Sequence, residues 1–210
     1  MYPFKTEDFL HSVALGLKSS LSLPELKAPL ASYGYDDRRL NEGVRLHKNV
    51  LSLQAQQSET RSVAKEATSA FQDAREGLES LYRRHIALAR LAFEKDSAAW
   101  EVLQLDGKRK RSIAGTQWQA QLFYTQLVNY LDVMEKYNLS KKEVQETTKL
   151  LEQLITLQVL QQQARNKAQT LTQMKDENLE LLVIWWRRFT KSARLAFEST
   201  PEYLEILGLA

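Results

Sequence analysis

The sequence has no cysteine and little that would interrupt a helix. Without Cys, disulfide bonds, thiolate metal sites and a cysteine nucleophile are excluded. All four prolines lie outside residues 30–200, and the seven scattered glycines form neither a phosphate-cradling loop nor a dinucleotide-binding fingerprint. The three histidines form neither the His-Glu-x-x-His nor the Glu-x-x-His pair of metal-binding helices. These absences favour a protein that is not an enzyme and needs no cofactor.

Long hydrophobic runs and a strong excess of one charge are also missing. No segment approaches the roughly 20 uninterrupted apolar residues of a membrane span, and the first residues lack the pattern of a signal or transit peptide. The 29 Lys and Arg residues nearly balance the 26 Asp and Glu residues, giving a net charge of +3. Nucleic-acid-binding domains usually show a larger excess. We expect a soluble, cytoplasmic protein without a transmembrane segment.

The chain contains an internal repeat. The segment YRRHIALARLAFE at 82–94 recurs as WRRFTKSARLAFE at 186–198, an offset of 186 − 82 = 104 residues. The same offset extends without a gap over 33–106. Because self-similarity at a fixed offset indicates repeated structural units, we interpret the chain as one all-α domain with an internal duplication. Repeat 1 covers about 1–107 and repeat 2 about 108–210.

Both repeats are expected to be helical. Apolar and small residues recur every three or four positions over 37–94 and over 141–198, in segments rich in good helix formers. Gly34 is typical of a residue just after a helix, and Ser140 followed by Glu143 is typical of a capping box. Each long segment forms either one very long helix or a hairpin that turns near its middle. The lack of turn residues in the middle favours the single helix.

Shorter helices flank each long segment. A helix is predicted at about 113–135, and its counterpart in repeat 1 is expected to be shorter and broken by Pro24 and Pro29. A short final helix is predicted within 94–107 and again within 198–210. The predicted fold is therefore an all-α, elongated up-and-down helical bundle with long helices of coiled-coil character.

Three segments carry a resemblance to a known family. They are LDGKRKRSIAGTQWQAQLFYTQLV at 105–128, the ARLAFE block that occurs in both repeats, and PEYLEILGL at 201–209. They are similar to segments of uncharacterised bacterial helical proteins that have an internal duplication and end in a Pro-x-Leu-Leu-x-x-Leu-Gly signature. The resemblance implies a helical bundle and carries no known activity.

Basic residues are candidate contacts for an anion or a partner. The longest uninterrupted run of like charge falls in a loop that we expect to be exposed and mobile. Further cations share helical faces near the ends of the long segments. They are typical of contacts to nucleic acid or an anionic membrane, or of a solvated linker and cations that complement a helix dipole. The candidates are Lys108, Arg109, Lys110, Arg111, Arg83, Arg90, Arg187, Lys191 and Arg194.

Polar residues at intervals of seven recur in the middle of both long segments. Repeated polar groups on one helical face form either a buried hydrogen-bonded layer that fixes the register or a plain solvated face. A buried layer would also offer a place for a small molecule or a metal. The candidates for this layer are Gln54, Arg61, Thr68, Gln158, Arg165 and Thr172.

Two of the histidines are interpreted as packing residues. At the repeat offset, Leu151 replaces His47 and Phe189 replaces His85, which indicates partly buried positions. The leading hypothesis is therefore a non-enzymatic structural or protein-interaction bundle that binds a protein partner or a second copy of itself. The alternative is an anion-binding module for nucleic acid or a membrane surface. A third hypothesis is a small-molecule or metal site at the central polar layer.

Overall fold

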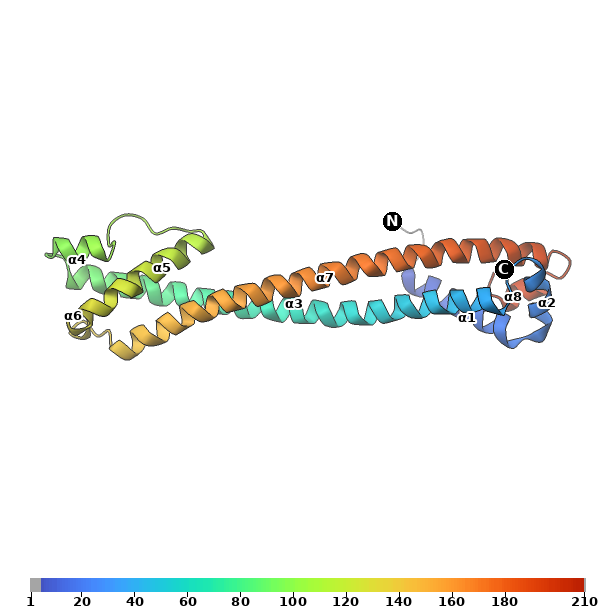
Figure 1. Cartoon of the computed structure of the whole chain (residues 1–210), viewed down its shortest axis with the longest axis horizontal. Helices are drawn as coiled ribbons and strands as arrows, with labels where there is room; N and C mark the ends of the chain where they lie inside the picture. The colour runs from blue at the N-terminus through green and yellow to red at the C-terminus, as the bar shows by residue number, and fades with distance from the viewer. Residues whose placement is uncertain (1–4, 210) are drawn as a thin grey trace. The chain divides into compact units, whose positions relative to one another are not determined.

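The structure is a computed structural model that describes residues 5–209, and over that range it contains helices and no strands. The all-α class and the up-and-down arrangement of two long helices are confirmed. The elements in Figure 1 are α1 (Thr6–Ser22), α2 (Pro24–Ser32), α3 (Asp37–Ala92), α4 (Ser97–Val102), α5 (Ile113–Leu127), the 3₁₀ turn η1 (Val128–Tyr130), α6 (Leu131–Glu135), α7 (Lys141–Ala196) and α8 (Glu202–Ile206).

Helices α3 and α7 are each continuous over 56 residues. The single-helix alternative is therefore correct for both segments, and the hairpin alternative is wrong. The two helices begin at residues 37 and 141, and 141 − 37 = 104 is the offset found in the sequence. Side chains cap both starts: Arg39 N–H donates to Oδ1 of Asp36 at 2.8 Å, and Glu143 N–H donates to Oγ of Ser140 at 3.2 Å.

The residues that lead into the two long helices adopt the left-handed conformation. Gly34 has φ +85° and Asn138 has φ +60°, and these positions are also 104 apart. Glycine adopts this conformation without steric cost, and asparagine tolerates it better than most residues do. The backbone reverses at both positions because these residue types permit it, which directs the chain from the short helices into α3 and α7.

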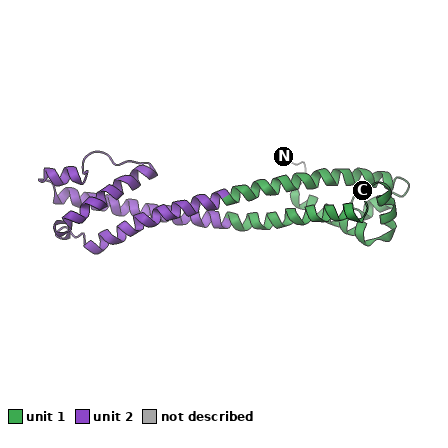
Figure 2. Cartoon of the chain, in the orientation of Figure 1, with its two compact units in different colours: residues 1–61, 167–210 green, residues 62–166 purple. Residues whose placement is uncertain are grey.

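Figure 2 shows that the chain forms two compact units. Unit 1 contains the residues up to Arg61 together with those from Lys167 onward, and unit 2 is Ser62–Asn166. Each unit contains the first part of one long helix, the second part of the other, and the short helices next to them. Each unit is thus built from both proposed repeats, and its boundaries fall in mid-helix instead of at the repeat junction near residue 107.

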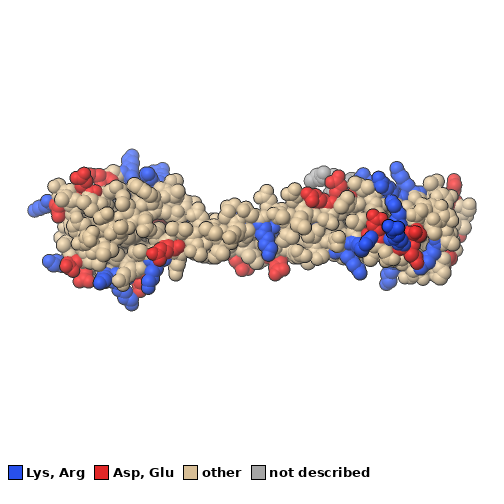
Figure 3. Space-filling model, viewed as in Figure 1, with Lys and Arg blue, Asp and Glu red and all other residues tan. Residues whose placement is uncertain are grey.

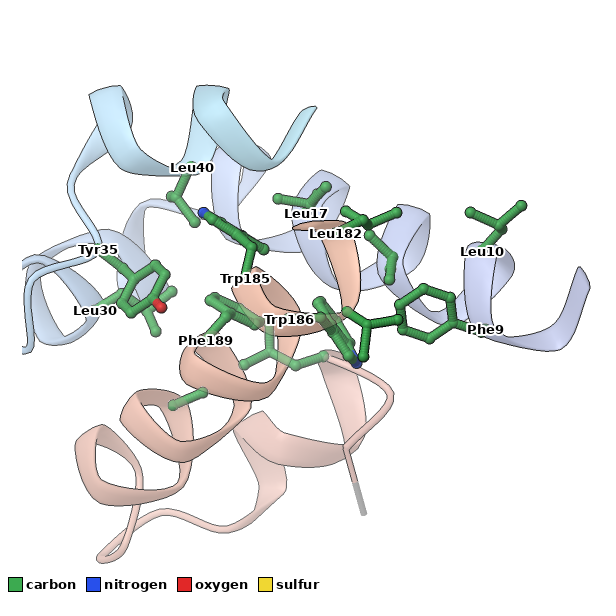
Figure 4. Close-up of a cluster of buried hydrophobic side chains, with 14 of the residues drawn as sticks. Phe9, Leu10, Leu17, Leu30, Tyr35, Leu40, Leu182, Trp185, Trp186 and Phe189 are labelled. Carbon is green, nitrogen blue, oxygen red and sulfur yellow. The ribbon is translucent and has the colours of Figure 1, made fainter. Parts of the chain in front are cut away.

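Aromatic side chains of α7 form the centre of the core of unit 1 (Figure 4). The ring of Trp185 stacks on Phe189 with centroids 5.4 Å apart, and Trp186 stacks on the same phenyl ring at 5.1 Å. Glycines make room for both indoles, because a Cβ atom at Gly43 would lie 2.5 Å from the Trp185 ring and one at Gly16 would lie 2.6 Å from the Trp186 ring. This core ties α1 and α3 to α7.

The core of unit 2 joins the second part of α3 to α5, α6 and the first part of α7. Tyr82 packs edge-on against Phe123 with ring centroids 5.6 Å apart, and Phe93 packs against Tyr130 at 5.2 Å. Other fully buried members of this core are Leu78, Ala89, Leu103, Leu105, Ala120, Leu127, Met134, Leu139, Leu151 and Leu154. These residues hold the loop between α4 and α5 against α3.

Two details of the short helices differ from the prediction. Pro24 does start a new helix, but Pro29 lies inside α2 without ending it. The segment predicted as one helix over 113–135 is divided into α5, the η1 turn and α6. Pro24 at the first position of α2 fits a helix start, because its missing N–H would have had no intrahelical acceptor. Pro29 is the sixth residue of α2 and removes one intrahelical hydrogen bond, yet the helix continues to Ser32.

Candidate functional site

Unit 2 has a cavity of about 290 Å³ next to the loop that joins α4 and α5. Four of the predicted cations line it, one from α3 and three from the loop: Arg83, Arg109, Lys110 and Arg111. Tyr82 and Thr116 complete most of the wall, from α3 and α5 respectively. The structure therefore brings together residues separated by 26 to 28 positions in the sequence, since 109 − 83 = 26 and 111 − 83 = 28.

Arginine side chains fasten the loop. Nε of Arg90 donates to the Leu105 carbonyl oxygen at 2.9 Å. The guanidinium of Arg109 donates to the carbonyl oxygens of Gln104 and Asp106, and its Nη1 donates to the Tyr82 hydroxyl at 3.3 Å. The bond to Tyr82 places Arg109 beside α3. Arg109 is half-buried, whereas Lys108, Lys110 and Arg111 are exposed as expected.

The start of α5 holds the other side of the loop. Lys110 N–H donates to Oε1 of Gln119 at 2.8 Å, and the Thr116 hydroxyl donates to the Lys110 carbonyl oxygen at 2.9 Å. Gly115 permits this approach, since a Cβ atom there would lie 2.8 Å from Cβ of Lys110 and 2.7 Å from Oγ of Ser112. The backbone of the basic run is thus fixed at both of its ends.

The charge around the cavity is predominantly positive. One acidic residue, Glu79, also lines it, so the lining residues carry 4 − 1 = +3. The Glu79 carboxylate already accepts from Nε of Arg75 at 2.8 Å, outside the lining. The Lys110 ammonium lies 5.0 Å from the centroid of the exposed Trp118 ring, a cation–π distance. The Arg83 and Arg111 side chains are exposed. Nε of Arg83 donates to the Glu79 carbonyl oxygen at 3.1 Å and its Nη2 lies 4.0 Å from the Glu79 carboxylate, so Arg83 would meet a ligand through its terminal nitrogens.

The remaining predicted cations do not line this cavity. Arg90 supports the loop through its hydrogen bonds to Leu105 and Gly107. Lys108 is exposed and lies outside the lining. The three cations of repeat 2 are exposed on the part of α7 that belongs to unit 1; they are Arg187, Lys191 and Arg194. The nine candidates therefore do not form one common site.

The residues predicted to form a buried polar layer are not the polar residues that the structure buries. The four residues Gln54, Arg61, Gln158 and Arg165 are exposed, while Thr68 and Thr172 are half-buried. The buried glutamines are instead Gln57 and Gln161, which are also 104 residues apart. In unit 1, Nε2 of Gln57 donates to Oγ1 of Thr172 at 2.8 Å. The side chains that point inward follow Val50 and Leu53 at helical spacing, and Gln54 lies one residue out of this phase.

A second polar group in unit 2 is fully buried. Nδ1 of His85 lies 2.9 Å from the Tyr124 hydroxyl, and its Nε2 lies 3.1 Å from Oε1 of Glu143, which also accepts from Arg84 at 2.6 Å. Burial lowers the pKa of His85, although the Glu143 carboxylate acts in the opposite direction. Burial raises the pKa of Tyr124, so its hydroxyl keeps its proton. The interpretation of His85 as a packing residue is confirmed.

An apolar surface lies on α7 in unit 2. Ile155, Val159 and Leu160 are 52%, 52% and 49% exposed. The first two are four residues apart, so they lie on one face of the helix. No Asp, Glu, Lys or Arg occurs in residues 153–164. On the face drawn in Figure 3, charged side chains gather over the short helices and are sparse over the middle of α3 and α7.

The residues that complete the cavity were not predicted from the sequence. In the sequence, Tyr82 is recognised only as a member of the apolar face of its helix, and no pattern marks Thr116 as a site residue. Their contribution depends on the contact of the loop with α3, which has no local signal in the sequence. Gln57 and Gln161 had a usable signal, because both continue the three-and-four spacing of buried apolar residues.

Comparisons with known proteins place no family or relative beside this chain: no protein-family model, curated protein or solved structure matches it. Within residues 5–209, no helix is long and apolar enough to cross a membrane. In the same range, no group of three or more His, Cys, Asp or Glu side chains is placed to hold a metal ion. The function must therefore be inferred from the surfaces of the molecule itself.

Proposed function

We propose that the chain is a non-enzymatic helical bundle that acts through protein–protein contact, and that its first partner is a second copy of the same chain. The observation that carries the proposal is the apolar surface of Ile155, Val159 and Leu160 on α7. Full burial of such a side chain is worth about 1.5–3 kcal/mol, and because these three are already about half-buried, covering each would contribute about half of that. A cluster of three on one helix segment is typical of a contact surface.

The position of these residues supports a contact with another helix. The opposite face of the same segment is already buried, through Leu151, Leu154 and Gln161. Apolar side chains on a second face have no role in packing α7 against α3 within unit 2. The neighbouring exposed residues are Thr and Gln side chains, which offer hydrogen bonds without charge. A partner helix would cover the second face and extend the bundle by one layer.

The lack of charge favours a second copy as the partner. In a twofold contact the same surface meets itself, so a charge near the axis would face its own copy. Residues 153–164 carry no charge, and two such segments can therefore pack antiparallel without repulsion. Glu152 and Arg165 at the ends of the segment have opposite signs, so an antiparallel pair would bring each near its complement.

The proposal is tested by sedimentation equilibrium of the full chain over a wide range of concentration. We expect the parent chain to form a dimer and the double variant Ile155→Gln/Val159→Gln to remain a monomer. Leu195→Gln is the matched control, because Leu195 is also an exposed apolar residue of α7 but lies in unit 1. A parent chain that is monomeric at every concentration, or a control that dissociates as readily as the double variant, contradicts the proposal.

A further inference from the structure

We propose that the basic cavity of unit 2 binds the phosphoryl group of a small phosphate ester. The cavity of about 290 Å³ is at the lower end of the range of small-molecule sites. This size suits a phosphate group with a small substituent. The residues that line the cavity differ from those of the apolar surface proposed for self-association, although Glu79 and Thr116 also lie beside Leu154 of α7.

The composition of the wall matches a phosphate dianion. Three arginines and one lysine line the cavity, against a single carboxylate, Glu79, that pairs with Arg75 and lies 4.0 Å from Nη2 of Arg83. Arginine offers parallel N–H donors in a planar fork that fits two phosphate oxygens at once. Arg83 and Arg111 are exposed, on α3 and on the loop respectively, so they approach the cavity from two different elements.

A buried donor without an acceptor is the second observation. Nε of Arg109 is buried, and in the part of the chain that the structure describes it has no hydrogen-bond partner. The other two nitrogens of this guanidinium are occupied by Tyr82 and by loop carbonyl oxygens. An unsatisfied buried donor costs about 1–3 kcal/mol. Protein atoms enclose this Nε, so a phosphate oxygen would become its acceptor once the Arg109 guanidinium turned toward the cavity.

The fixed loop favours a single phosphate group over a long polyanion. Arg90 and Thr116 donate hydrogen bonds to carbonyl oxygens of the loop, and the Lys110 N–H donates to Oε1 of Gln119, so the loop backbone that carries three of the cations is held in place before a ligand arrives. A polyanion surface needs cations spread along one face, whereas the cations here surround one cavity. The basic run at 108–111 has no counterpart of four consecutive cations before α1, so we expect the site in unit 2 only.

The first test is calorimetric titration of the full chain with inorganic phosphate, pyrophosphate and adenosine 5′-monophosphate, with adenosine as the ligand that lacks phosphate. We expect the phosphate compounds to bind and adenosine not to bind. Arg83→Gln/Arg111→Gln should weaken binding at least about tenfold, since each arginine donates charge-assisted hydrogen bonds. Arg187→Gln is the matched control, because Arg187 occupies the position of Arg83 in repeat 2 and should leave binding unchanged.

The second test follows the buried Nε–H group of Arg109. In ¹⁵N-labelled protein, the Arg109 Nε–H resonance should shift when inorganic phosphate is added, and its exchange with water should slow. Unchanged affinity in the double variant, or an unaffected Arg109 resonance, overturns the proposal. Tight binding of an oligonucleotide or of phosphatidic acid vesicles would also overturn the proposal if Arg187→Gln weakened it as much as Arg83→Gln/Arg111→Gln. Diffuse surface charge would then explain the binding. The dimer test is independent, since neither arginine variant alters the apolar surface.

Discussion

Nε2 of His85 lies 3.1 Å from a carboxylate oxygen of Glu143, and this contact determines the tautomer of the buried ring. A carboxylate only accepts hydrogen bonds, so Nε2 of His85 carries the proton and Nδ1 is left as an acceptor. The hydroxyl of Tyr124, which lies 2.9 Å from Nδ1, must then be the donor. The neutral ring thus satisfies both neighbours, and protonation of Nδ1 would break the hydrogen bond from Tyr124.

The buried histidine predicts a stability that decreases in acid. Burial lowers the pKa of His85 in the folded chain, while the unfolded chain takes up a proton near pH 6.5. Below that pH the unfolded state binds more protons, so the free energy of unfolding falls as the pH falls. One such group contributes a slope of up to about 1.4 kcal/mol per pH unit. Urea unfolding followed by circular dichroism from pH 8 to pH 5 measures this slope.

His85→Phe is the informative variant, because Phe189 occupies the same position in repeat 2. We expect it to reduce the loss of stability between pH 6.5 and pH 5. His47→Leu, which introduces the residue type of Leu151 in repeat 2, should remove a further part, since burial lowers the pKa of His47 as well. If His85→Phe keeps the full slope of the parent chain, the assignment of acid sensitivity to this ring is wrong.

Replacement of two glycines of α3 by alanine should change the free energy of unfolding in opposite directions. A Cβ atom at Gly43 would lie 2.5–2.8 Å from three atoms of the Trp185 ring, so the indole would have to move out of its stack with Phe189. Overpacking of this kind costs about 1–3 kcal/mol. The gain in helix propensity of about 0.5–1 kcal/mol offsets part of it. Gly43→Ala should therefore lower the free energy of unfolding by about 1–2 kcal/mol.

Gly77→Ala provides the matched comparison. Gly77 also lies within α3, but its nearest neighbour beyond the helix backbone would be a methyl carbon of Leu150 at 4.0 Å, an ordinary contact distance. At Gly77 only the higher helix propensity of alanine acts, so the substitution should raise the free energy of unfolding by up to about 1 kcal/mol. Both values are obtained by urea unfolding at pH 8. Equal effects of the two substitutions would show that the packing of Trp185 over Gly43 does not limit that position.

Local signals made most of the fold predictable. Asp36 and Ser140 cap the two long helices, and the left-handed Gly34 and Asn138 precede them, so the starts of α3 and α7 could be placed within one residue. Each of these features depends on a few neighbouring residues. The division into two units was not predicted, because it depends on which part of α3 packs against which part of α7. That pairing joins residues far apart in the sequence, such as Gln57 and Thr172 at a separation of 115 in unit 1 and Arg84 and Glu143 at a separation of 59 in unit 2.

The candidate site was only partly predictable for the same reason. The basic run at 108–111 and the exposed Arg83 are visible in the sequence, but their convergence on one cavity depends on the hydrogen bonds of Arg90 and Arg109 to the loop. The prediction of the polar layer was wrong because it chose helix positions that do not face the core. Heptad spacing selected Gln54, whereas a straight helix rotates each side chain by about 100° per residue, and Gln57 follows the buried face.

The buried glutamine leads to the last prediction. The Gln57 amide donates to Oγ1 of Thr172 at 2.8 Å, and that hydroxyl in turn donates to the Ala168 carbonyl oxygen at 2.9 Å. The two long helices are thus joined by a polar chain in unit 1. Gln57→Ala should lower the free energy of unfolding by about 1–2 kcal/mol, because a buried acceptor loses its donor. Gln54→Ala, at the exposed neighbouring position, should change it by less than about 0.5 kcal/mol.

A double-mutant cycle isolates the contact itself. Gln57→Ala and Thr172→Val are measured singly and together, and the hydrogen bond should appear as a coupling of about 0.5–1.5 kcal/mol. Thr172→Val keeps the shape of the side chain while removing Oγ1, so its single effect also includes the bond to Ala168. Strictly additive single effects would mean that the amide and the hydroxyl do not act together. The register of α3 against α7 in unit 1 would then depend on the apolar residues alone, with Val50 and Leu53 as the nearest members of that face.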